Sequence, residues 1–430
     1  MQILSKMDNN ETNTARAWSW IPTLYFTQGL PNVAAATLSV VLYKNLGVSN
    51  DDIAFYTSWL YLPWVIKPLW SPLVEVLGRK RFWIVALQFV LGAAFASVAW
   101  AVPGPEFFRW TLVLFWLVAF ASATHDIAAD GFYLLALPPH QQAAFVGVRS
   151  TFFRLAMIAG QGVAVWLAGY WAKSLGVAPA WSRVFLVLSG VFVVVGLFHR
   201  FVLPRPVDDG RAKRQSGMLA EWWQVFAAYF CRKQIATMLL FLLFYRFAES
   251  QLVKLAQPFL LDGRDKGGLG MTTDWVGVCY GTTGTVALLA GGLLGGWLVS
   301  RHGLRRWLWP MAIAINVPNL VYVYLAAVRP ESLAVIGGMI AIEQFGYGFG
   351  FTAYMLYMMI AAEGRHRTAH YAICTGFMAL GMMLPGMKAG WLQEQLGYVS
   401  FFGWVCLATI PSFVVTAMVK VDDRFGRRAE

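Results

Sequence analysis

Long apolar stretches alternate with short polar connections along the whole chain. Twelve of these stretches have about 20 residues or slightly more, the length that a helix needs to cross roughly 30 Å of hydrocarbon at 1.5 Å per residue. Only helices and closed barrels span a bilayer, and continuous stretches of this length are helices. The pattern therefore predicts an all-α, polytopic membrane protein. The predicted spans are residues 18–42, 53–76, 83–102, 110–135, 143–171, 184–203, 235–261, 275–300, 307–328, 333–361, 368–393 and 398–420.

The composition excludes an ordinary soluble domain. Of the 430 residues, 58% are hydrophobic and 13% are charged, whereas a soluble domain has about 25% charged residues. A water-soluble surface cannot be built from so few charges. The polar segment 1–16 lacks the cleavage site of a secretory signal, so we expect the first span to remain in the mature protein.

The net charge of +12 reflects the orientation of the chain in the membrane. Of the 34 Lys and Arg residues, 21 fall in the termini and in the loops on the same side of the membrane, and 7 fall in the loops of the opposite side. Basic residues concentrate in short cytoplasmic loops. Both termini are therefore predicted to be cytoplasmic, and no nucleic-acid partner is expected.

The spans form two groups of six. The long polar connection after the sixth span divides the chain into a first bundle (1–203), a cytoplasmic linker (204–234) and a second bundle (235–430). Residues 71–81 (SPLVEVLGRKR) follow the second span, and residues 296–306 (GWLVSRHGLRR) follow the eighth at an offset of 225 residues. Two pseudo-symmetric six-helix bundles with a charged central loop are typical of alternating-access transporters, whose substrate site lies near the midplane between the halves. The predicted function is thus movement of a solute, without catalysis.

Both repeated loops resemble the loop signature of the major facilitator superfamily. Physically, Glu75 can accept hydrogen bonds from Arg79 or from a neighbouring helix N-terminus, and such a contact can be made in one state and broken in another. The alternative is a simple turn with orienting charges. The candidate conformational-switch residues are Glu75, Gly78, Arg79, Lys80, Gly303 and Arg305.

Ten charged residues fall within the predicted spans. Each costs roughly 2.5–3.5 kcal/mol at the centre of a membrane helix, so such residues face the bundle interior, pair, and mark a pathway. They are the basic residues Lys67, Arg149, Arg154, Arg246, Lys254 and Lys388 and the acidic residues Asp126, Asp130, Glu249 and Glu343.

Spans four and five place two of these pairs together. Asp126 and Asp130 are four residues apart, so they share one face of the fourth span. The pairs Asp130 with Arg149 and Asp126 with Arg154 are both centred on the turn at residues 138–140, so an antiparallel hairpin puts each pair at one depth, in the cytoplasmic half. These residues are either structural ion pairs or groups that carry coupling protons or touch the substrate.

Glu343 is the leading candidate for a proton carrier, followed by Asp126. It lies about ten residues into the tenth span without a basic residue in that span, so it must find a partner on another helix, be protonated, or meet the substrate. A permanent bridge from Glu343 to Arg246 or Lys388 is the structural alternative. Arg246 and Glu249, three residues apart on the seventh span, are further candidates.

Several weaker signals remain. Lys67 lies between two prolines that distort the second span, where it either pairs with an acid of the fourth span or snorkels inward. The spacing of His125 and Asp130 matches an acyltransferase dyad, but no companion motif for an enzyme accompanies it. His366 and His370 are expected to cap the eleventh span and not to bind a metal ion. The four cysteines have no paired spacing, so we expect no disulfide, metal or cofactor.

At the level of motifs the chain resembles the AmpG-type muropeptide permeases of the major facilitator superfamily. The resemblance extends over all twelve spans and implies proton-driven uptake of cell-wall fragments, in which N-acetylglucosamine is linked to anhydro-N-acetylmuramic acid with or without a peptide. It also implies a bacterial inner-membrane location, and it makes Gln28 of the first motif a candidate site residue. The motifs are residues 26–31 (FTQGLP), 67–73 (KPLWSPL), 122–130 (SATHDIAAD), 153–155 (FRL), 245–249 (YRFAE) and 343–345 (EQF) with the glycines that follow.

One departure from that family bears on the substrate. After Asp130 the family commonly has a bulky aromatic residue followed by Lys and an acid, whereas this chain continues with Gly131 and an apolar run. If those polar residues read the peptide of a muropeptide, this protein prefers a smaller amino-sugar ligand. Relatives of the same group move siderophores or acetyl-coenzyme A, so another medium-sized solute, including a peptide, is the alternative. The expected partners are the solute, protons and the lipid bilayer, and the expected oligomeric state is a monomer.

Overall fold

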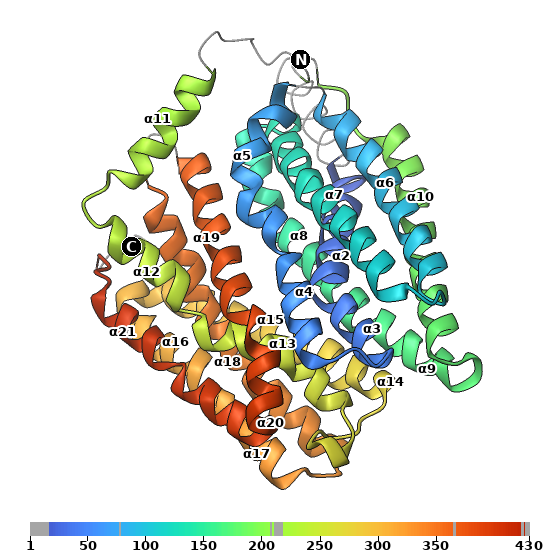
Figure 1. Cartoon of the computed structure of the whole chain (residues 1–430). Coiled ribbons are helices and arrows are strands. Elements are labelled where there is room, and N and C mark those ends of the chain that lie inside the picture. The colour runs from blue at the N-terminus through green and yellow to red at the C-terminus, as the bar shows by residue number, and fades with distance from the viewer. Residues whose placement is uncertain are drawn as a thin grey trace. The chain divides into compact units, whose positions relative to one another are not determined.

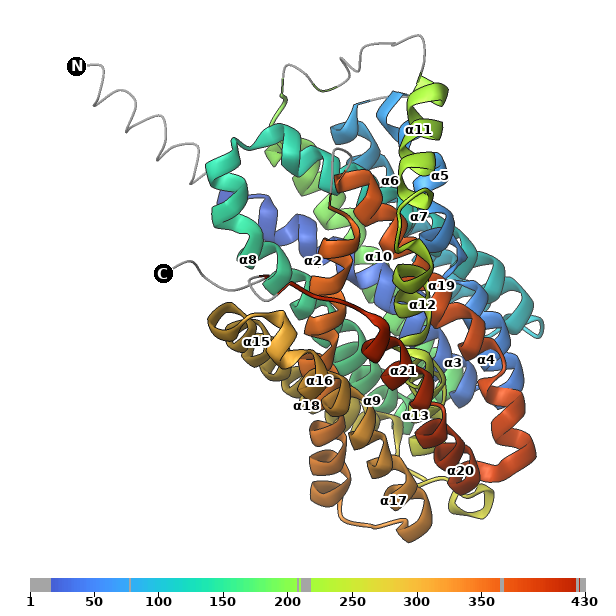
Figure 2. The same cartoon turned by 90° about the vertical axis from the view of Figure 1, so that its left-hand side faces the viewer.

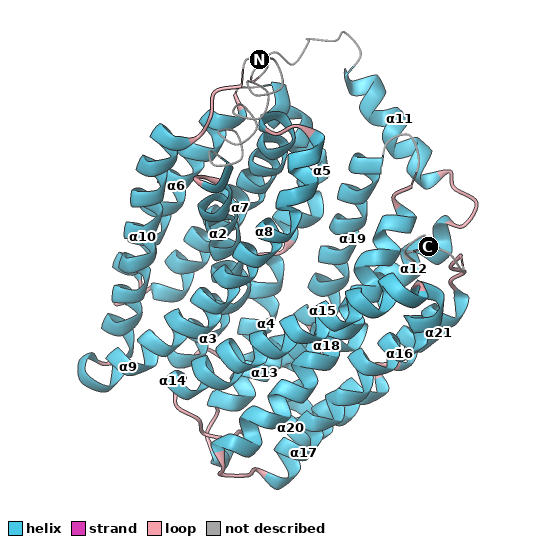
Figure 3. Cartoon of the chain, turned by 180° about the vertical axis from the view of Figure 1, so that it is seen from behind, coloured by secondary structure: helices cyan, strands magenta, loops and turns pink. Residues whose placement is uncertain are grey.

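The computed structural model describes residues 17–76, 79–206, 209, 218–363, 367–422 and 425, and most of these residues are helical. Figure 3 shows helices joined by short loops, and no strand occurs in the described ranges. The first six spans comprise α2 (Ile21–Val33), η1 (Ala34–Leu38) and α3 (Ser39–Asn45); α4 (Asn50–Trp59) and α5 (Leu62–Val76); α6 (Lys80–Ala101); α7 (Phe107–Ala136); α8 (Pro139–Met157), η2 (Ile158–Ala164) and α9 (Val165–Leu175); and α10 (Val177–Val202).

The last six spans follow a further helix, α11 (Met218–Phe230), which lies inside the predicted linker. They comprise α12 (Ile235–Phe244) and α13 (Phe247–Leu261); α14 (Thr273–Val276), η4 (Gly277–Gly284) and α15 (Thr285–His302); α16 (Leu304–Asn316), η5 (Val317–Asn319) and α17 (Leu320–Val328); α18 (Leu333–Ala361); α19 (Arg367–Met387); and α20 (Ala389–Leu407) with α21 (Ile410–Met418).

The predicted twelve spans are confirmed. Nine helices of the described chain are long and apolar enough by themselves to cross a membrane. Spans one and two are each divided into shorter helices, and the turn between spans eleven and twelve lies inside α20, where Gly397 has a φ of 71°. A positive φ of this size favours glycine because it lacks a Cβ atom.

Several spans are interrupted along their length. Spans one, five and eight contain the π-helical segments η1, η2 and η4, and the seventh span breaks between α12 and α13 at Arg246, whose φ is −110°. Such irregular turns inside helices are frequent at functional sites because they redirect side chains and free backbone groups.

Contacts between helices group the described chain into two units. Unit 1 comprises Met1–Ala35, Leu69–Gly160 and Ala178–Arg214, and thus contains most of the first six spans. Figure 1 shows α6, α7 and α10 of this unit running side by side. Its core on the side of the termini is aromatic: Trp20 and Phe132 meet edge to face with ring centroids 5.4 Å apart, and both are buried.

Unit 2 comprises Ala36–Pro68, Gln161–Val177 and Gln215–Glu430. It joins spans seven to twelve to the outer ends of spans one, two and five, where "outer" denotes the helix ends next to residues 46–49, 176, 262–272 and 397. Within it α4 contacts α19 and α20, and α9 contacts α14. The division of the chain into two six-span domains and a linker stays a prediction.

Glycines let the helices of unit 2 approach closely. Figure 2 shows α18 alongside α15 and α16. A Cβ atom at Gly348 would lie 1.9 Å from the carbonyl oxygen of Leu288, and one at Gly346 would lie 2.2 Å from that of Ala314. Small residues at helix interfaces are what membrane bundles use for tight packing. The glycines that follow the 343–345 motif are thus explained by helix contacts.

The close contacts of α18 predict that a larger side chain destabilises the protein at some glycines of this helix and not at others. Gly348→Val should lower the melting temperature of the purified protein in detergent, since overpacking a close contact costs typically about 1–3 kcal/mol. Gly338→Val in the same helix is the matched control, because a Cβ atom there has no neighbour within 4 Å. Equal losses in the two variants would show that the α15 contact is not the reason for Gly348.

Candidate functional site

Unit 1 holds an ion pair beside two tyrosines. Nη2 of Arg149, on α8, lies 2.7 Å from Oδ1 of Asp130, on α7. The guanidinium lies 4.3 Å from the ring centroids of both Tyr25 and Tyr133, which meet edge to face. The Tyr25 hydroxyl donates to the same carboxylate oxygen at 3.3 Å. Arg149 is therefore held by its ion pair with Asp130 and by cation–π contacts with the two tyrosine rings.

The predicted pairing of Asp130 with Arg149 is confirmed. The hairpin turn after Leu137 brings α7 and α8 together, as equal distances from the turn require. The pair is half-buried, with side-chain exposures of 45% for the acid and 27% for the base, so removing one partner should cost less than the about 3–5 kcal/mol typical when a fully buried pair is broken. Asp126 and Arg154 are half-buried on the same helices, and their pairing stays a prediction.

Two motif residues of span one lie nearby in unit 1. Gln28 is buried, and its Oε1 has no hydrogen-bond partner in the part of the chain that the structure describes. Gly29 lets α2 approach α8, because a Cβ atom there would lie 2.9 Å from the carbonyl oxygen of Phe153 and 2.7 Å from Cβ of Ala156. Packing explains the glycine, whereas the unsatisfied oxygen of Gln28 is compatible with ligand contact.

A buried network of polar side chains joins four spans of unit 1. Nε2 of Gln88 lies 2.9 Å from Nδ1 of His199 and 3.3 Å from Nε2 of His125. The other ring nitrogen of His199 lies 2.9 Å from the Thr23 hydroxyl. Sequence reasoning missed this network because its members are isolated polar residues on separate spans. It also gives His125 a structural partner other than Asp130.

Arg246 is the centre of the polar cluster in unit 2. Its guanidinium donates to the Tyr347 hydroxyl at 2.6 Å and lies 3.4 Å from the Glu249 carboxylate. It also lies 4.7 Å from the centroid of the Phe351 ring. The interruption of span seven at Arg246 turns both charged side chains toward α18. The Arg246–Glu249 pair is buried, with side-chain exposures of 8% and 3%.

Glu343 lies in the same unit without an ion pair to any described residue. Its residue exposure is 3%, and Nε2 of Gln344 donates to its Oε2 at 3.0 Å. The expected alternative, a bridge to Arg246 or Lys388, is absent: among the described residues no basic side chain lies within 4 Å of this carboxylate.

Two other basic residues of the sequence analysis are Lys388 and Lys67, and only Lys388 differs from the position expected for it. Lys388 is exposed at the start of α20, so it is not a charge buried in the bundle. Lys67 is half-buried in α5, and its pairing with the fourth span stays a prediction.

The structure instead draws attention to Lys254, which the sequence analysis did not rank as a site residue. It is 2% exposed on α13. Its ammonium donates to the Thr57 hydroxyl at 3.0 Å and lies 4.9 Å from the Tyr61 ring centroid. The contacts of α13 with α4 and α19 confirm the expectation that this lysine faces the bundle interior.

A network of polar side chains closes the outer end of unit 2. Lys44 of α3 lies 2.6 Å from the Asp262 carboxylate, at the end of α13. The Tyr398 hydroxyl donates to the same carboxylate at 2.6 Å, and Asn50 of α4 donates to Gln393 of α20 at 2.6 Å. These five residues connect spans one and two with spans seven, eleven and twelve.

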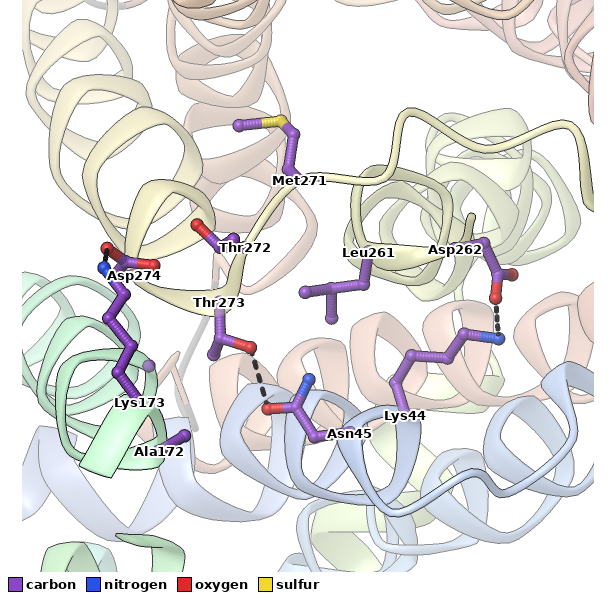
Figure 4. A pocket seen from close by; sticks show the side chains of 11 residues that line it. Lys44, Asn45, Ala172, Lys173, Leu261, Asp262, Met271, Thr272, Thr273 and Asp274 are labelled. Carbon is purple, nitrogen blue, oxygen red and sulfur yellow. Dashed lines mark hydrogen bonds and ion pairs between the residues drawn. The ribbon is translucent and has the colours of Figure 1, made fainter. Parts of the chain in front are cut away.

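A second ion pair lies beside the first. Lys173 of α9 lies 2.6 Å from Asp274 of α14, and the Thr273 hydroxyl donates to Asn45 at 3.0 Å. Both contacts line a cavity of about 450 Å³ that also borders Lys44 and Asp262 (Figure 4). The backbones are in direct contact here, since a Cβ atom at Gly169 would lie 2.1 Å from the Asp274 nitrogen.

Of the predicted switch loop after span two, Gly78 and the side chain of Glu75 lie outside the described residues. The start of α6 binds another acid: the backbone N–H groups of Lys80 and Arg81 donate to the Asp209 carboxylate at 2.7 and 3.2 Å. An acid at a helix N-terminus satisfies free N–H groups and the helix dipole. Asp209 lies far along the chain, so loop spacing could not reveal it.

The remaining switch residues occupy helix ends. Arg79 precedes α6 and is exposed, as is Arg305 in the first turn of α16. Gly303 joins α15 to α16 with a φ of 83°, a conformation that favours glycine. A switching role for these residues stays a prediction. For metal binding, no group of three His, Cys, Asp or Glu side chains suited to an ion occurs within the described ranges.

The amino-acid sequence is similar to a family model and to known proteins. The family model described as Major Facilitator Superfamily matches residues 23–384. Anhydromuropeptide permease of Escherichia coli is 27% identical over 422 residues, which cover 94% of this chain and 81% of that protein. Putative transporter AmpG 4 of Rickettsia conorii is 24% identical over 411 residues, covering 91% of this chain and 94% of that one.

Solved structures share the fold at lower identity. The nucleoside transporter NupG matches with a TM-score of 0.71 and 14% identity, covering 95% of this chain and 100% of that one. The inward open conformation of the xylose transporter XylE from E. coli matches with a TM-score of 0.67 and 9% identity, covering 94% and 96%. At such identities the likeness is evidence for the fold alone.

Because Lys44 and Tyr398 both donate to the Asp262 carboxylate, we predict that Asp262 holds the helix ends at the outer end of unit 2 together. Asp262→Asn leaves Lys44 facing a neutral amide, and removing one partner of a buried ion pair costs about 3–5 kcal/mol. In a cysteine-free background, Leu261→Cys should then react at least about tenfold faster with a membrane-impermeant maleimide added outside, a shift that needs only about 1.4 kcal/mol.

Asp265→Asn is the matched control for this measurement, because Asp265 is an exposed acid in the same loop. Equal labelling rates in the two variants would contradict a closing role for Asp262.

Proposed function

The chain belongs to the Major Facilitator Superfamily and is a multi-pass inner-membrane transporter, and from that premise we propose that it imports a cell-wall-derived amino sugar or muropeptide. The solute is of the type N-acetylglucosamine linked to anhydro-N-acetylmuramic acid. The observation that carries the proposal is the similarity to anhydromuropeptide permease along 94% of the chain. Both termini are cytoplasmic in this proposal, in accord with the loop charges.

The residue after Asp130 supports a preference for a small ligand. A Cβ atom at Gly131 would lie 2.5 Å from Cε of Lys80, so in this structure the flexible end of the lysine lies beside the glycine. The chain lacks the polar residues that related permeases carry at this point, and we propose that it takes the disaccharide with a short peptide or none.

Import is coupled to protons, with Glu343 as the carrier. A carrier must gain and lose its proton during each cycle, which a permanent ion pair would prevent. Glu343 meets this requirement because it is buried and has no basic side chain within 4 Å in the described chain. Asp130, in contrast, has Arg149 at 2.7 Å.

Transport proceeds by alternating access. The ion pairs Lys44–Asp262 and Lys173–Asp274 connect the first six spans with the last six at their outer ends. A path from outside requires these contacts to break, and helix ends joined by a few polar contacts can change between two discrete arrangements. Part of the closing contact is backbone against backbone, as at Gly390, where a Cβ atom would lie 2.0 Å from the Asn50 carbonyl oxygen.

The proposed substrate is tested by uptake into liposomes that contain the purified protein. We expect saturable uptake of the labelled disaccharide, stimulated by external acid, and weaker uptake of the same disaccharide with a tetrapeptide. A siderophore, an unrelated peptide and acetyl-coenzyme A complete the panel. Uptake of one of these three in place of the disaccharide would overturn the proposed substrate.

The proposed coupling is tested with Glu343→Gln, which imitates the protonated side chain. This variant should lose accumulation driven by a pH gradient and keep exchange of labelled for unlabelled solute at equal pH. Gln344→Ala is the control for the neighbouring contact, because it removes the hydrogen bond to Glu343 and leaves the carboxyl group in place. Accumulation by Glu343→Gln in response to external acid would show that Glu343 is not the carrier.

A further inference from the structure

Lys254 carries an ammonium group that is buried and incompletely satisfied. A lysine has three N–H donors and no acceptor. The Thr57 hydroxyl accepts one hydrogen bond at 3.0 Å, and the face of the Tyr61 ring lies 4.9 Å away. In the described part of the chain no carboxylate lies within 4 Å of this nitrogen.

Two other lysines of unit 2 that lie near the outer end have a carboxylate partner. Lys44 and Lys173 each have a carboxylate oxygen at 2.6 Å. Both side chains are more exposed than Lys254, at 12% and 58%, so they need a partner less. A charge buried without an opposite charge is costly. In a membrane protein it marks a functional position more often than a structural one.

A second polar group without a partner lies beside Lys254. The Ser58 hydroxyl is buried and has no hydrogen-bond partner in the described ranges. A Cβ atom at Gly386 would lie 3.0 Å from this oxygen and 3.3 Å from Cγ of Lys254, so α4, α13 and α19 meet at this point. The absence of a side chain at Gly386 lets the helices that carry Ser58 and Lys254 pack closely at this point.

Lys254 lies on the same helix whose end takes part in the polar network at the outer end of unit 2. It lies on α13 between the Arg246–Glu249 pair and Asp262, the acid that holds the outer ends together. Its present contacts, Thr57 and Tyr61, belong to span two, whereas Lys254 belongs to span seven. An opening of the outer end therefore withdraws both contacts and leaves the ammonium without an acceptor, at the moment when solute enters from outside.

We propose that Lys254, assisted by Ser58, binds a carboxylate of the transported solute. This inference rests on the proposed function and concerns its peptide-free solute, because the muramic acid unit carries a free carboxylate in its lactyl group only where no peptide is joined there as an amide. The carboxylate replaces the Thr57 hydroxyl as acceptor and supplies the charge that the described chain does not place beside Lys254. Lys254 thus distinguishes the acid from neutral sugars of similar shape.

The test measures binding of two ligands by the full-length protein in nanodiscs. One ligand is N-acetylglucosaminyl-anhydro-N-acetylmuramic acid, and the other is the same disaccharide with its carboxylate converted to a methyl amide. We expect the wild type to bind the acid about tenfold or more tightly than the amide, which corresponds to one charge-assisted hydrogen bond.

Lys254→Met should abolish this preference, because it should weaken binding of the acid and leave binding of the amide unchanged. Lys254→Gln, which keeps a polar group of similar length, serves if the Met variant does not fold. Lys266→Met is the matched control, because Lys266 is exposed in the loop after α13. That variant should keep the wild-type ratio of the two affinities.

The outcomes separate this inference from the proposed function. If the wild type binds acid and amide equally, or if Lys254→Met weakens both to the same extent, the carboxylate site is wrong while the proposed solute stands. If the wild type binds neither disaccharide, the proposed solute is wrong and the carboxylate site is wrong with it.

Discussion

A charged side chain inside a bundle of membrane helices must find a partner, and this constraint organises the polar interior of the protein. Water is not available to compensate the charge, so each ion is paired, hydrogen-bonded or kept near an opening. Asp130 meets Arg149, and Arg246 meets Glu249. Against this background Glu343, which has no basic partner within the described ranges, is distinctive.

The same constraint applies at the outer end of unit 2. The ion pair of Lys44 with Asp262 joins helix ends there, and under the proposed alternating access these contacts would break and re-form. Asp262 is central because Lys44 and Tyr398 both donate to its carboxylate. Its loss would leave several groups unsatisfied at once. Fully buried pairs such as Arg246–Glu249 suit a permanent role better.

Close packing complements these polar contacts. Lipid tails are as apolar as the helix surfaces, so burial of apolar area does not hold membrane helices together, and short contacts between small residues become important. Gly348 and Gly346 bring α18 against α15 and α16, and Gly169 and Gly390 bring the outer ends into backbone contact. These contacts of α18 fix the position of the helix that carries Glu343.

The sequence by itself determined the class of protein, the twelve spans and the Asp130–Arg149 pair. The spans and the pair follow from local rules: the length of apolar runs and the equal depth of residues that flank one hairpin turn. Such rules act on segments that are adjacent in the chain, so no tertiary information is needed.

Only the tertiary structure decided which isolated polar residues meet. Asp209 binds the start of α6 from more than a hundred positions away, and His199 meets Gln88 across two spans that are not neighbours in sequence. Lys254 and Lys388 look alike as single lysines in apolar runs, yet one is buried against Thr57 and the other is exposed. The direction in which a helix turns each side chain depends on its kinks and on its neighbours, and those are properties of the packed bundle.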